Sequence, residues 1–122
     1  MLKFVDIYSP LLRLSDTLSY NARLNILYAL LKERSASQSI SHLSVPSWET
    51  HIAFVNSHPY KKWMLILDGR VAVGAIYLTS VNEIGISILK RYRRKGYASA
   101  AIKKLIKSNP RHGVYFDGRK HP

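Results

Sequence analysis

Residues 83–106 read EIGISILKRYRRKGYASAAIKKLI, and this stretch decides the fold of the 122-residue chain. It predicts a buried strand over Glu83–Leu89, a basic loop at Arg93-Arg94-Lys95-Gly96, and an amphipathic helix that begins directly after the loop. The expected N-cap has no Ser, Thr, Asp or Asn, so the first amide donors of the helix need another acceptor. A phosphate would satisfy them, because a helix N-terminus carries partial positive charge and glycine lets a ligand approach the backbone. The stretch therefore predicts a site for a phosphorylated ligand.

The composition fits one globular domain over residues 1–122. Hydrophobic residues make up 47% and charged residues 21%, which are proportions of a folded chain rather than a disordered one. No apolar run reaches the roughly 18 residues of a membrane span, and the N-terminus lacks a signal-peptide pattern. The absence of cysteine excludes a disulfide framework and a thiol nucleophile. We therefore expect a cytoplasmic protein that does not enter a membrane.

The charge is strongly positive, with 19 Lys and Arg against 7 Asp and Glu and a formal net charge of +12. Such a surplus attracts nucleic acid, acidic proteins or phosphorylated cofactors, and it does not choose among them. An isolated basic run such as RYRRK is more often a solvated turn. The prediction of an anion site therefore depends on the glycine, the uncapped helix and the preceding strand taken together.

The N-terminal third predicts a strand, a helix and a loop. We expect the strand at Leu2–Tyr8 and a serine-rich surface loop at Ser35–Ser44. The helix between them begins after a cap at Asp16 or Ser19. Its inward face, at helical spacing, is formed by Tyr20, Leu24, Leu27, Tyr28 and Leu31.

The middle of the chain predicts a second helix and an antiparallel meander. The helix begins near Pro46 or Ser47 and stops before His58-Pro59, and its inward residues are Trp48, Ile52 and Val55. The strands are expected at Lys62–Leu67, Val71–Thr79 and Glu83–Leu89. Asp68-Gly69 between the first two strands is a strong hairpin signal, and we expect these two residues to form the turn.

The C-terminal part predicts a helix and a last strand. The helix has an apolar face of Ala98, Ala101, Ile102, Leu105 and Ile106, with Lys103, Lys104 and Lys107 opposite it. Asn109-Pro110 ends it, and His112–Phe116 is a fifth strand. The order is strand, two helices, three antiparallel strands, helix and strand, which predicts an α+β fold with helices packed on a sheet.

The loop motif R-x-x-G-x-A, from Arg93 to Ala98, resembles the acyl-CoA-binding motif of the GNAT (GCN5-related) N-acyltransferase superfamily. The longer run from Glu83 to Ala98 is similar to the branch that includes the ribosomal-protein N-terminal acetyltransferases. That branch favours an E-I-G strand start, an aromatic residue before the arginine, and G-Y-A after it. The family's element order also matches residues 2–116. The resemblance implies a GNAT-like fold, with a mixed, mainly antiparallel sheet flanked by helices, and transfer of an acetyl group from acetyl-CoA to a primary amine.

The resemblance also implies a set of site residues. The amides of Arg94 through Ala98 would hold the CoA pyrophosphate, with Ser99 near the same phosphates. Ile86 and Ile88 match positions whose backbone contacts the thioester and pantetheine, while their side chains belong to the core. The implied cofactor-binding residues are thus Ile86, Ile88, Arg93, Arg94, Lys95, Gly96, Tyr97, Ala98 and Ser99.

Glu83 is the candidate catalytic residue, as a general base or amine-orienting carboxylate. An amine is protonated near neutral pH and must lose that proton before it attacks the thioester. Some family members carry the carboxylate one position earlier, which here is Asn82, and strand side chains alternate between faces. The alternative is that Glu83 is an ordinary residue at the edge of a turn.

Other residues carry weaker signals. The five histidines show no metal-ligand spacing, and we expect no metal. Trp48 and Trp63 are predicted core or groove-lining residues, and His58 and Tyr60 precede a strand on the acceptor side of a GNAT-like fold. The acceptor amine itself is not identified by any motif.

The chain stops at Pro122, soon after the predicted fifth strand, where family members normally add a helix and two strands. We therefore expect a C-terminally shortened fold: a minimal form, a truncated or frameshifted end, or a homodimer in which a partner completes the sheet. Tyr115 lies on the strand and receives no catalytic role. The second hypothesis for function is a non-catalytic basic protein that binds nucleic acid or a protein partner and keeps only the scaffold, with Lys103, Lys104 and Lys107 on its binding face.

Overall fold

The computed structural model describes residues 2–10, 18–37, 45–108 and 115–116. The elements are β1 (Leu2–Asp6), α1 (Tyr20–Ser37), α2 (Trp48–Asn56), β2 (Lys62–Asp68), β3 (Val71–Leu78), β4 (Glu83–Ile88), α3 (Tyr97–Ser108) and β5 (Tyr115–Phe116), with a 3-10 turn at Lys90–Tyr92. This is the predicted α+β order. The predicted cap at Asp16, residues 38–44 of the predicted loop, residues 112–114 of the last strand and the C-terminal tail lie outside the described residues. The predicted shortening of the fold and a partner that completes the sheet therefore stay predictions.

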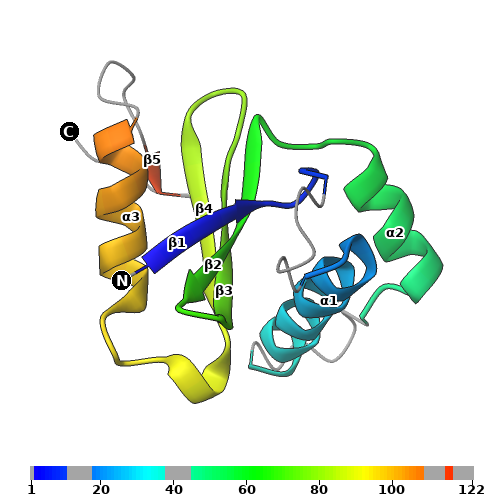
Figure 1. Ribbon diagram of the computed structural model, residues 1–122. Coiled ribbons are helices and arrows are strands. Elements are labelled where there is room, and N and C mark those ends of the chain that lie inside the picture. The colour runs from blue at the N-terminus through cyan, green and yellow to red at the C-terminus, as the bar shows by residue number, and fades with distance from the viewer. Residues whose placement is uncertain (1, 11–17, 38–44, 109–114, 117–122) are drawn as a thin grey trace.

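The sheet has five strands in the order β1-β2-β3-β4-β5 (Figure 1). The first four are antiparallel neighbours, as the meander predicted. The fifth runs parallel to β4, with Glu83 opposite Tyr115 and Ile84 opposite Phe116. Within the described part of the chain, the remainder of β4 has a neighbouring strand only on its β3 side.

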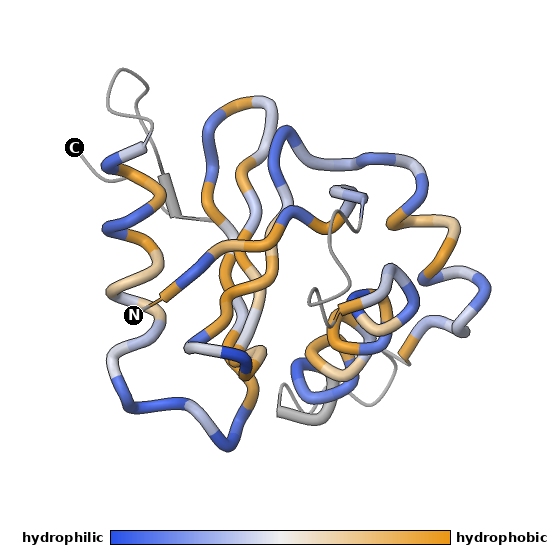
Figure 2. The backbone as a smooth tube through the Cα atoms, in the orientation of Figure 1, coloured by the Kyte–Doolittle hydropathy of each residue, from blue (hydrophilic) through white to orange (hydrophobic). Residues whose placement is uncertain are grey.

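The helices cover both faces of the sheet, with α3 on one side and α1 and α2 on the other (Figure 1). Alternate residues of β2 point to opposite faces, because successive side chains of a strand alternate. Trp63 and Leu65 pack against α1 and α2, whereas Ile66 packs against α3. Figure 2 shows the corresponding apolar stretches along the central strands and the inner sides of the helices. We call these two sides the α1/α2 face and the α3 face.

The first helix begins as predicted but is longer and slightly rotated. The Ser19 hydroxyl accepts the Ala22 amide at 3.1 Å, which confirms the Ser19 cap. The helix continues to Ser37, so the prediction of a loop from Ser35 was wrong at its start. Serine costs only a few tenths of a kcal/mol per residue relative to good helix formers, so a serine-rich composition does not stop a helix. Tyr20, predicted to face inward, is 38% exposed.

A buried arginine on α1 organises the turn after β1. Arg23 is only 3% exposed, and its guanidinium donates to the carbonyl oxygens of Asp6, Ile7, Ser9 and Leu18. These bonds satisfy backbone groups that would otherwise be buried without partners. The sequence pattern gave no signal for this role, because an arginine on an amphipathic helix normally faces solvent.

The second helix is confirmed, with the Ser47 hydroxyl accepting the Thr50 amide at 3.1 Å. Val55 is buried and Ile52 partly buried, as predicted. His51 is 5% exposed, and its Nε2 lies 3.0 Å from the Leu24 carbonyl oxygen, so this ring ties α2 to α1.

The β2–β3 hairpin is confirmed, but its turn lies one residue later than predicted. Asp68 pairs with Val71, so Gly69 and Arg70 form the turn. Of these two, only Gly69 has a positive φ, at 63°. A two-residue turn with a positive φ only at its first central position needs glycine only there. Gly69 fills that position, so Asp68 remains the last residue of the strand.

The last helix packs on the sheet through a narrower stripe than predicted. Ala101 and Leu105 are fully buried against the α3 face. Ile106, which we predicted to be part of that face, is 43% exposed. Ala98 and Ile102, which were also predicted on that face, are partly buried against the same cluster.

Candidate functional site

The loop between β4 and α3 is held against the sheet by backbone and side-chain hydrogen bonds. The Leu89 amide donates to the Val73 carbonyl at 2.8 Å, and Arg93 Nε donates to the Ile88 carbonyl at 3.0 Å. On the other side, the Lys90 amide donates to Glu33 Oε1 of α1 at 2.8 Å. The loop thus starts from a fixed position, although its outer part is exposed.

Two residues of this loop have left-handed backbone conformations, Arg94 with φ of 65° and Gly96 with φ of 83°. Turns that contain left-handed residues can direct neighbouring N–H groups toward one concave side, which is a common anion-binding geometry. A Cβ added at Gly96 would meet no atom within 4 Å. The glycine therefore serves the backbone conformation and leaves open space beside the start of α3.

At the start of α3, several amides have no hydrogen-bond partner in the described part of the chain. The first helical hydrogen bond runs from the Ala100 amide to the Gly96 carbonyl at 3.1 Å, so the amides of Gly96, Tyr97, Ala98 and Ser99 precede it. Gly96 at the N-cap has no side chain to accept from them, as the sequence predicted. Five exposed basic residues lie in the loop and the turn that precedes it: Lys90, Arg91, Arg93, Arg94 and Lys95. The predicted phosphate-binding residues are therefore brought together in one place.

Tyr97, the first residue of α3, is tied to the β2–β3 hairpin. Its hydroxyl donates to Asp68 Oδ2 at 2.6 Å. This hydrogen bond lowers the pKa of the Asp68 carboxyl and raises the pKa of the Tyr97 hydroxyl. The contact fixes the position from which the helix amides project. No sequence signal predicted it, because the two residues are far apart in the chain.

The side chains of β4 divide between the two faces of the sheet. Ile84 and Ile88 are buried on the α3 face, and Ile86 packs beside them. The prediction that the Ile86 and Ile88 side chains belong to the core is thus confirmed. Glu83 and Ser87 alternate with these isoleucines and belong to the α1/α2 face.

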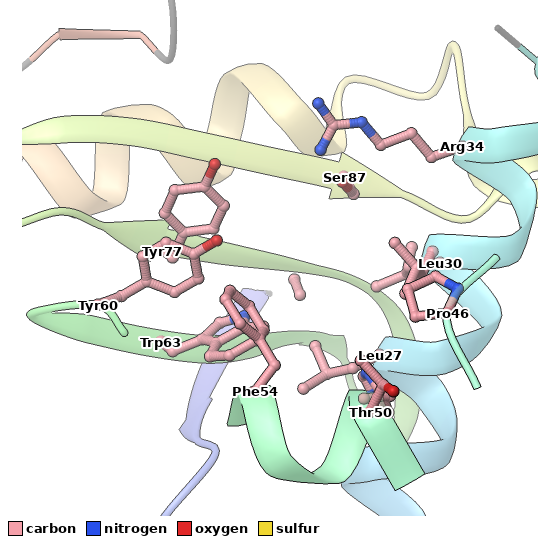
Figure 3. Close-up of a pocket in the computed structure, with 13 residues that line it drawn as sticks. Leu27, Leu30, Arg34, Pro46, Thr50, Phe54, Tyr60, Trp63, Tyr77 and Ser87 are labelled. Atoms are coloured by element: carbon pink, nitrogen blue, oxygen red, sulfur yellow. The ribbon is translucent and has the colours of Figure 1, made fainter. Parts of the chain in front are cut away.

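A pocket of about 330 Å³ lies on the α1/α2 face and reaches β4 at Ser87 (Figure 3). It is lined from α1 by Leu27, Leu30, Leu31 and Arg34, and from α2 and the residue before its cap by Pro46, Thr50, His51 and Phe54. The sheet side contributes Tyr60, Trp63, Ala75, Tyr77 and Ser87. The lining is mostly apolar and aromatic.

Aromatic rings form one wall of this pocket. The Tyr60 and Tyr77 rings are stacked, with centroids 3.8 Å apart and 6° between their planes, and Trp63 meets Tyr60 edge-on at 4.8 Å. The Tyr77 ring covers Gly85, since a Cβ added there would lie 1.9 Å from a ring carbon. Gly85 therefore provides the space that this wall needs.

Glu83 is not among the residues that line the pocket. Its amide donates to Thr79 Oγ1 at 3.0 Å, and Gly85, under the Tyr77 ring, separates it from Ser87 on the same strand face. Asn82 has a φ of 65° in the preceding turn, and within the described part of the chain its side-chain oxygen is buried without a hydrogen-bond partner. The catalytic role of Glu83 stays a prediction.

Of the two residues predicted on the acceptor side, Tyr60 lines the pocket, whereas His58 stacks on Tyr8 with centroids 3.9 Å apart. Trp63 and Trp48 were predicted as core or groove-lining residues. Trp63 is buried in the core and also lines the pocket, and Trp48 packs against the same core, edge-on to Tyr28. The sequence reasoning missed Phe54, Thr50 and Tyr77, whose spacing in the chain carries no motif. Among the described residues no cluster of potential metal ligands occurs, and no described helix is long and apolar enough to cross a membrane.

Solved acetyltransferase structures share this fold at low sequence identity. An acetyltransferase from Thermus thermophilus is 11% identical with a TM-score of 0.62, and the match covers 87% of this chain and 68% of that one. The microcin C7 self-immunity acetyltransferase MccE, solved with acetyl-CoA and AMP, is 18% identical with a TM-score of 0.52 over 76% and 61% of the two chains. An aminoglycoside acetyltransferase from an uncultured soil metagenomic sample is 17% identical with a TM-score of 0.52 over 95% and 75%.

No curated protein matches the sequence significantly. The Acetyltransferase (GNAT) family matches residues 27–116, which include most of α1, all elements from α2 through β5, and the whole loop before α3. The fold, the uncapped helix with its glycine loop and this match agree, and the chain belongs to the GNAT acetyltransferase family.

Proposed function

We propose that this protein is an N-acetyltransferase that transfers the acetyl group of acetyl-CoA to a primary amine. The observation that carries the proposal is the start of α3. There four amides precede the first helical hydrogen bond, the space beside Gly96 is open, and five exposed basic residues lie just before the helix. The resemblance of the Arg93–Ala98 motif to the acyl-CoA-binding motif of the GNAT family supports this assignment, and the structure of the structurally similar acetyltransferase MccE contains acetyl-CoA. The motif between Glu83 and Ala98 further favours the branch that resembles ribosomal-protein N-terminal acetyltransferases.

In this proposal the amides of Arg94 through Ala98 and the side chain of Ser99 bind the pyrophosphate. Charge from the exposed Arg93, Arg94 and Lys95 adds to the partial positive charge of the helix. The pantetheine lies along the β4 edge beyond its pairing with β5, where the backbone of Ile86 and Ile88 is the contact. Their side chains remain in the core.

The reaction is a direct attack. The amine nitrogen adds to the thioester carbonyl carbon, the new C–N bond replaces the C–S bond, and the thiolate leaves and takes up a proton. Glu83 is the proposed acceptor of the amine's proton. Because Glu83 lies outside the pocket lining, we propose that this proton passes through water.

Thermal denaturation with and without acetyl-CoA tests the cofactor half of the proposal. A ligand that binds only the folded state stabilises it by RT ln(1 + [L]/Kd) and so raises the melting temperature. We expect a clear rise for the unchanged protein, a smaller rise for Gly96→Ala, and none for Gly96→Glu, which places a carboxylate where the phosphates bind. Gly69→Ala is the matched control, because Gly69 also has a positive φ and open space around a Cβ.

Gly69→Ala and Gly96→Ala should each lose about 1 kcal/mol of unfolding free energy from backbone strain, and only the second should weaken the response to acetyl-CoA. No rise in melting temperature for the unchanged protein at millimolar acetyl-CoA would contradict the proposal. If duplex DNA then bound with a steep salt dependence, the non-catalytic basic protein would replace the enzyme as the better explanation.

A further inference from the structure

The pocket on the α1/α2 face has a chemical character that the family membership does not dictate. Phe54, Tyr60, Trp63 and Tyr77 give it four aromatic rings, and the aliphatic side chains of α1 complete the opposite wall (Figure 3). Ring contacts among Phe54, Tyr60 and Trp63, at centroid distances of 4.8 to 6.1 Å, fix these walls in place. Such a preformed apolar cavity favours an apolar group of matching size.

Acidic side chains are absent from the described lining of the pocket. It contains neither Asp nor Glu, and its arginine, Arg34, extends from α1 toward the end of β4 that bears Ser87 (Figure 3). His51 Nε2 is engaged with the Leu24 carbonyl at 3.0 Å. An ammonium group buried here would lose its hydration, at a cost of several kcal/mol, without gaining a carboxylate. Attraction to an aromatic ring offsets only about 0.5–2 kcal/mol of this cost. A polycationic acceptor such as an aminoglycoside or a polyamine therefore does not fit this pocket.

The size of the pocket limits the group that enters. A volume of about 330 Å³ is at the lower end of the range for small-molecule sites, which suits one ring system and a short linker rather than several sugar rings. The pocket meets β4 at Ser87, directly before Ile88, whose backbone is proposed to contact the coenzyme. A group held in the pocket thus lies next to the strand along which the acyl donor is proposed to bind.

We infer that the acceptor is a small primary amine that carries one aromatic or branched aliphatic group and no second ammonium, with that apolar group in the pocket. The amine nitrogen then lies at the Ser87 end, outside the ring-lined part. This inference deepens the proposed function and rests on it for the identity of the second substrate. Binding of the apolar group, however, depends on the pocket alone and is measured separately.

The test uses isothermal titration calorimetry and the amine-dependent release of the CoA thiol. The ligands are 2-phenylethylamine, a tripeptide amide with N-terminal phenylalanine, spermidine and kanamycin. We expect 2-phenylethylamine to bind at least about tenfold more tightly than spermidine or kanamycin, because only its ring gains apolar contact. The tripeptide distinguishes a peptide N-terminus from a free small amine as the acceptor. We expect it to bind more weakly than 2-phenylethylamine, because its further residues lie outside the pocket.

Two variants on α2 locate the binding. Thr50→Trp places a large ring at a lining position, while Ala53→Trp adds the same ring at an exposed position of the same helix that does not line the pocket. We expect Thr50→Trp to weaken binding of 2-phenylethylamine by about tenfold or more and Ala53→Trp to leave it unchanged. Both should keep the response to acetyl-CoA.

Each outcome decides the question. Equal or tighter binding of spermidine or kanamycin, no binding of 2-phenylethylamine at millimolar concentration, or equal effects of the two tryptophan variants would overturn the inference. Tighter binding of the tripeptide than of the free amine would overturn its small-molecule part. Failure of acetyl-CoA to bind, with 2-phenylethylamine still bound in a Thr50-dependent way, would refute the proposed function and leave the pocket's preference standing.

Discussion

Gly85→Ala should destabilise the protein through a single steric conflict with Tyr77. A Cβ at residue 85 would lie 1.9 to 2.3 Å from three atoms of the Tyr77 side chain, far inside contact distance. The ring has little room to move, because its other side is stacked on Tyr60 at 3.8 Å. Overpacking of this kind costs about 1–3 kcal/mol, and replacing a strand glycine by alanine returns roughly 0.5–1 kcal/mol. The net loss of unfolding free energy then lies between about 0 and 2.5 kcal/mol, and the close contact with a ring that cannot move away places it in the upper half of that range.

A double-mutant cycle isolates that conflict. Tyr77→Ala alone should cost roughly 2 kcal/mol, because it removes a half-buried aromatic side chain. Without the Tyr77 ring, the methyl group at residue 85 no longer has a steric conflict. In that background Gly85→Ala should therefore be neutral or slightly stabilising. The double variant should then be about 1–3 kcal/mol more stable than the sum of the single losses predicts.

Urea denaturation of the four proteins measures this coupling, with the slope of each transition as a check that the unfolded state is unchanged. Additive losses within about 0.5 kcal/mol would refute the reasoning, because independent sites behave in that way. Binding of 2-phenylethylamine provides a second reading. Gly85→Ala should weaken it, since a displaced Tyr77 ring narrows the pocket.

Three further predictions concern other parts of the molecule. Glu83→Gln should leave acetyl-CoA affinity unchanged and lower kcat by about 10²–10⁴-fold, as measured by thiol release, if Glu83 is the base; an unchanged kcat would assign the proton to another group. Arg23→Met should cost about 3 kcal/mol or more in urea denaturation, because the carbonyls that Arg23 bonds lose their donors; a loss below about 1 kcal/mol would contradict that role. Tyr97→Phe should remove part of the acid sensitivity of stability. In the folded protein the pKa of Asp68 lies below its ordinary value of 3.8. The stability that the ionised Asp68 contributes is therefore present above pH 3.8 and is lost as the pH falls through the pKa of the folded protein. Melting temperatures between neutral and acidic pH measure it, and identical profiles for the two proteins would exclude it.

The sequence predicted the elements of the fold because its signals are local. The Ser19 cap, the start of the second helix near Ser47 and the apolar run of β2 each depend on residues within a few positions of one another. The errors are at boundaries. The turn after β2 moved by one residue because Asp68 is kept in the strand, and α1 continued through serines that only composition had assigned to a loop.

Only the part of the candidate site that is contiguous in sequence, the loop before α3, could be predicted. The loop proposed to bind phosphate is a single run from Arg93 to Ser99, so its glycine and its charged residues can be recognised in one stretch of sequence. The pocket is assembled from two helices and three strands, and the approach of Phe54 to Tyr60 depends on how α2 packs on the sheet. The Asp68–Tyr97 contact has the same origin. Tertiary packing brings these residues together, and no local spacing in the sequence predicts their contact.

The most direct test of the central claim is the amide spectrum of ¹⁵N-labelled protein titrated with acetyl-CoA. If the start of α3 binds the pyrophosphate, the amide signals of Gly96, Tyr97, Ala98 and Ser99 should move most, together with Ile86 and Ile88 along β4, while those of the β2–β3 turn at Gly69 should stay in place. Saturable shifts confined to other regions, with the amides of 96–99 unaffected, would contradict the assignment of this element as the acetyl-CoA site.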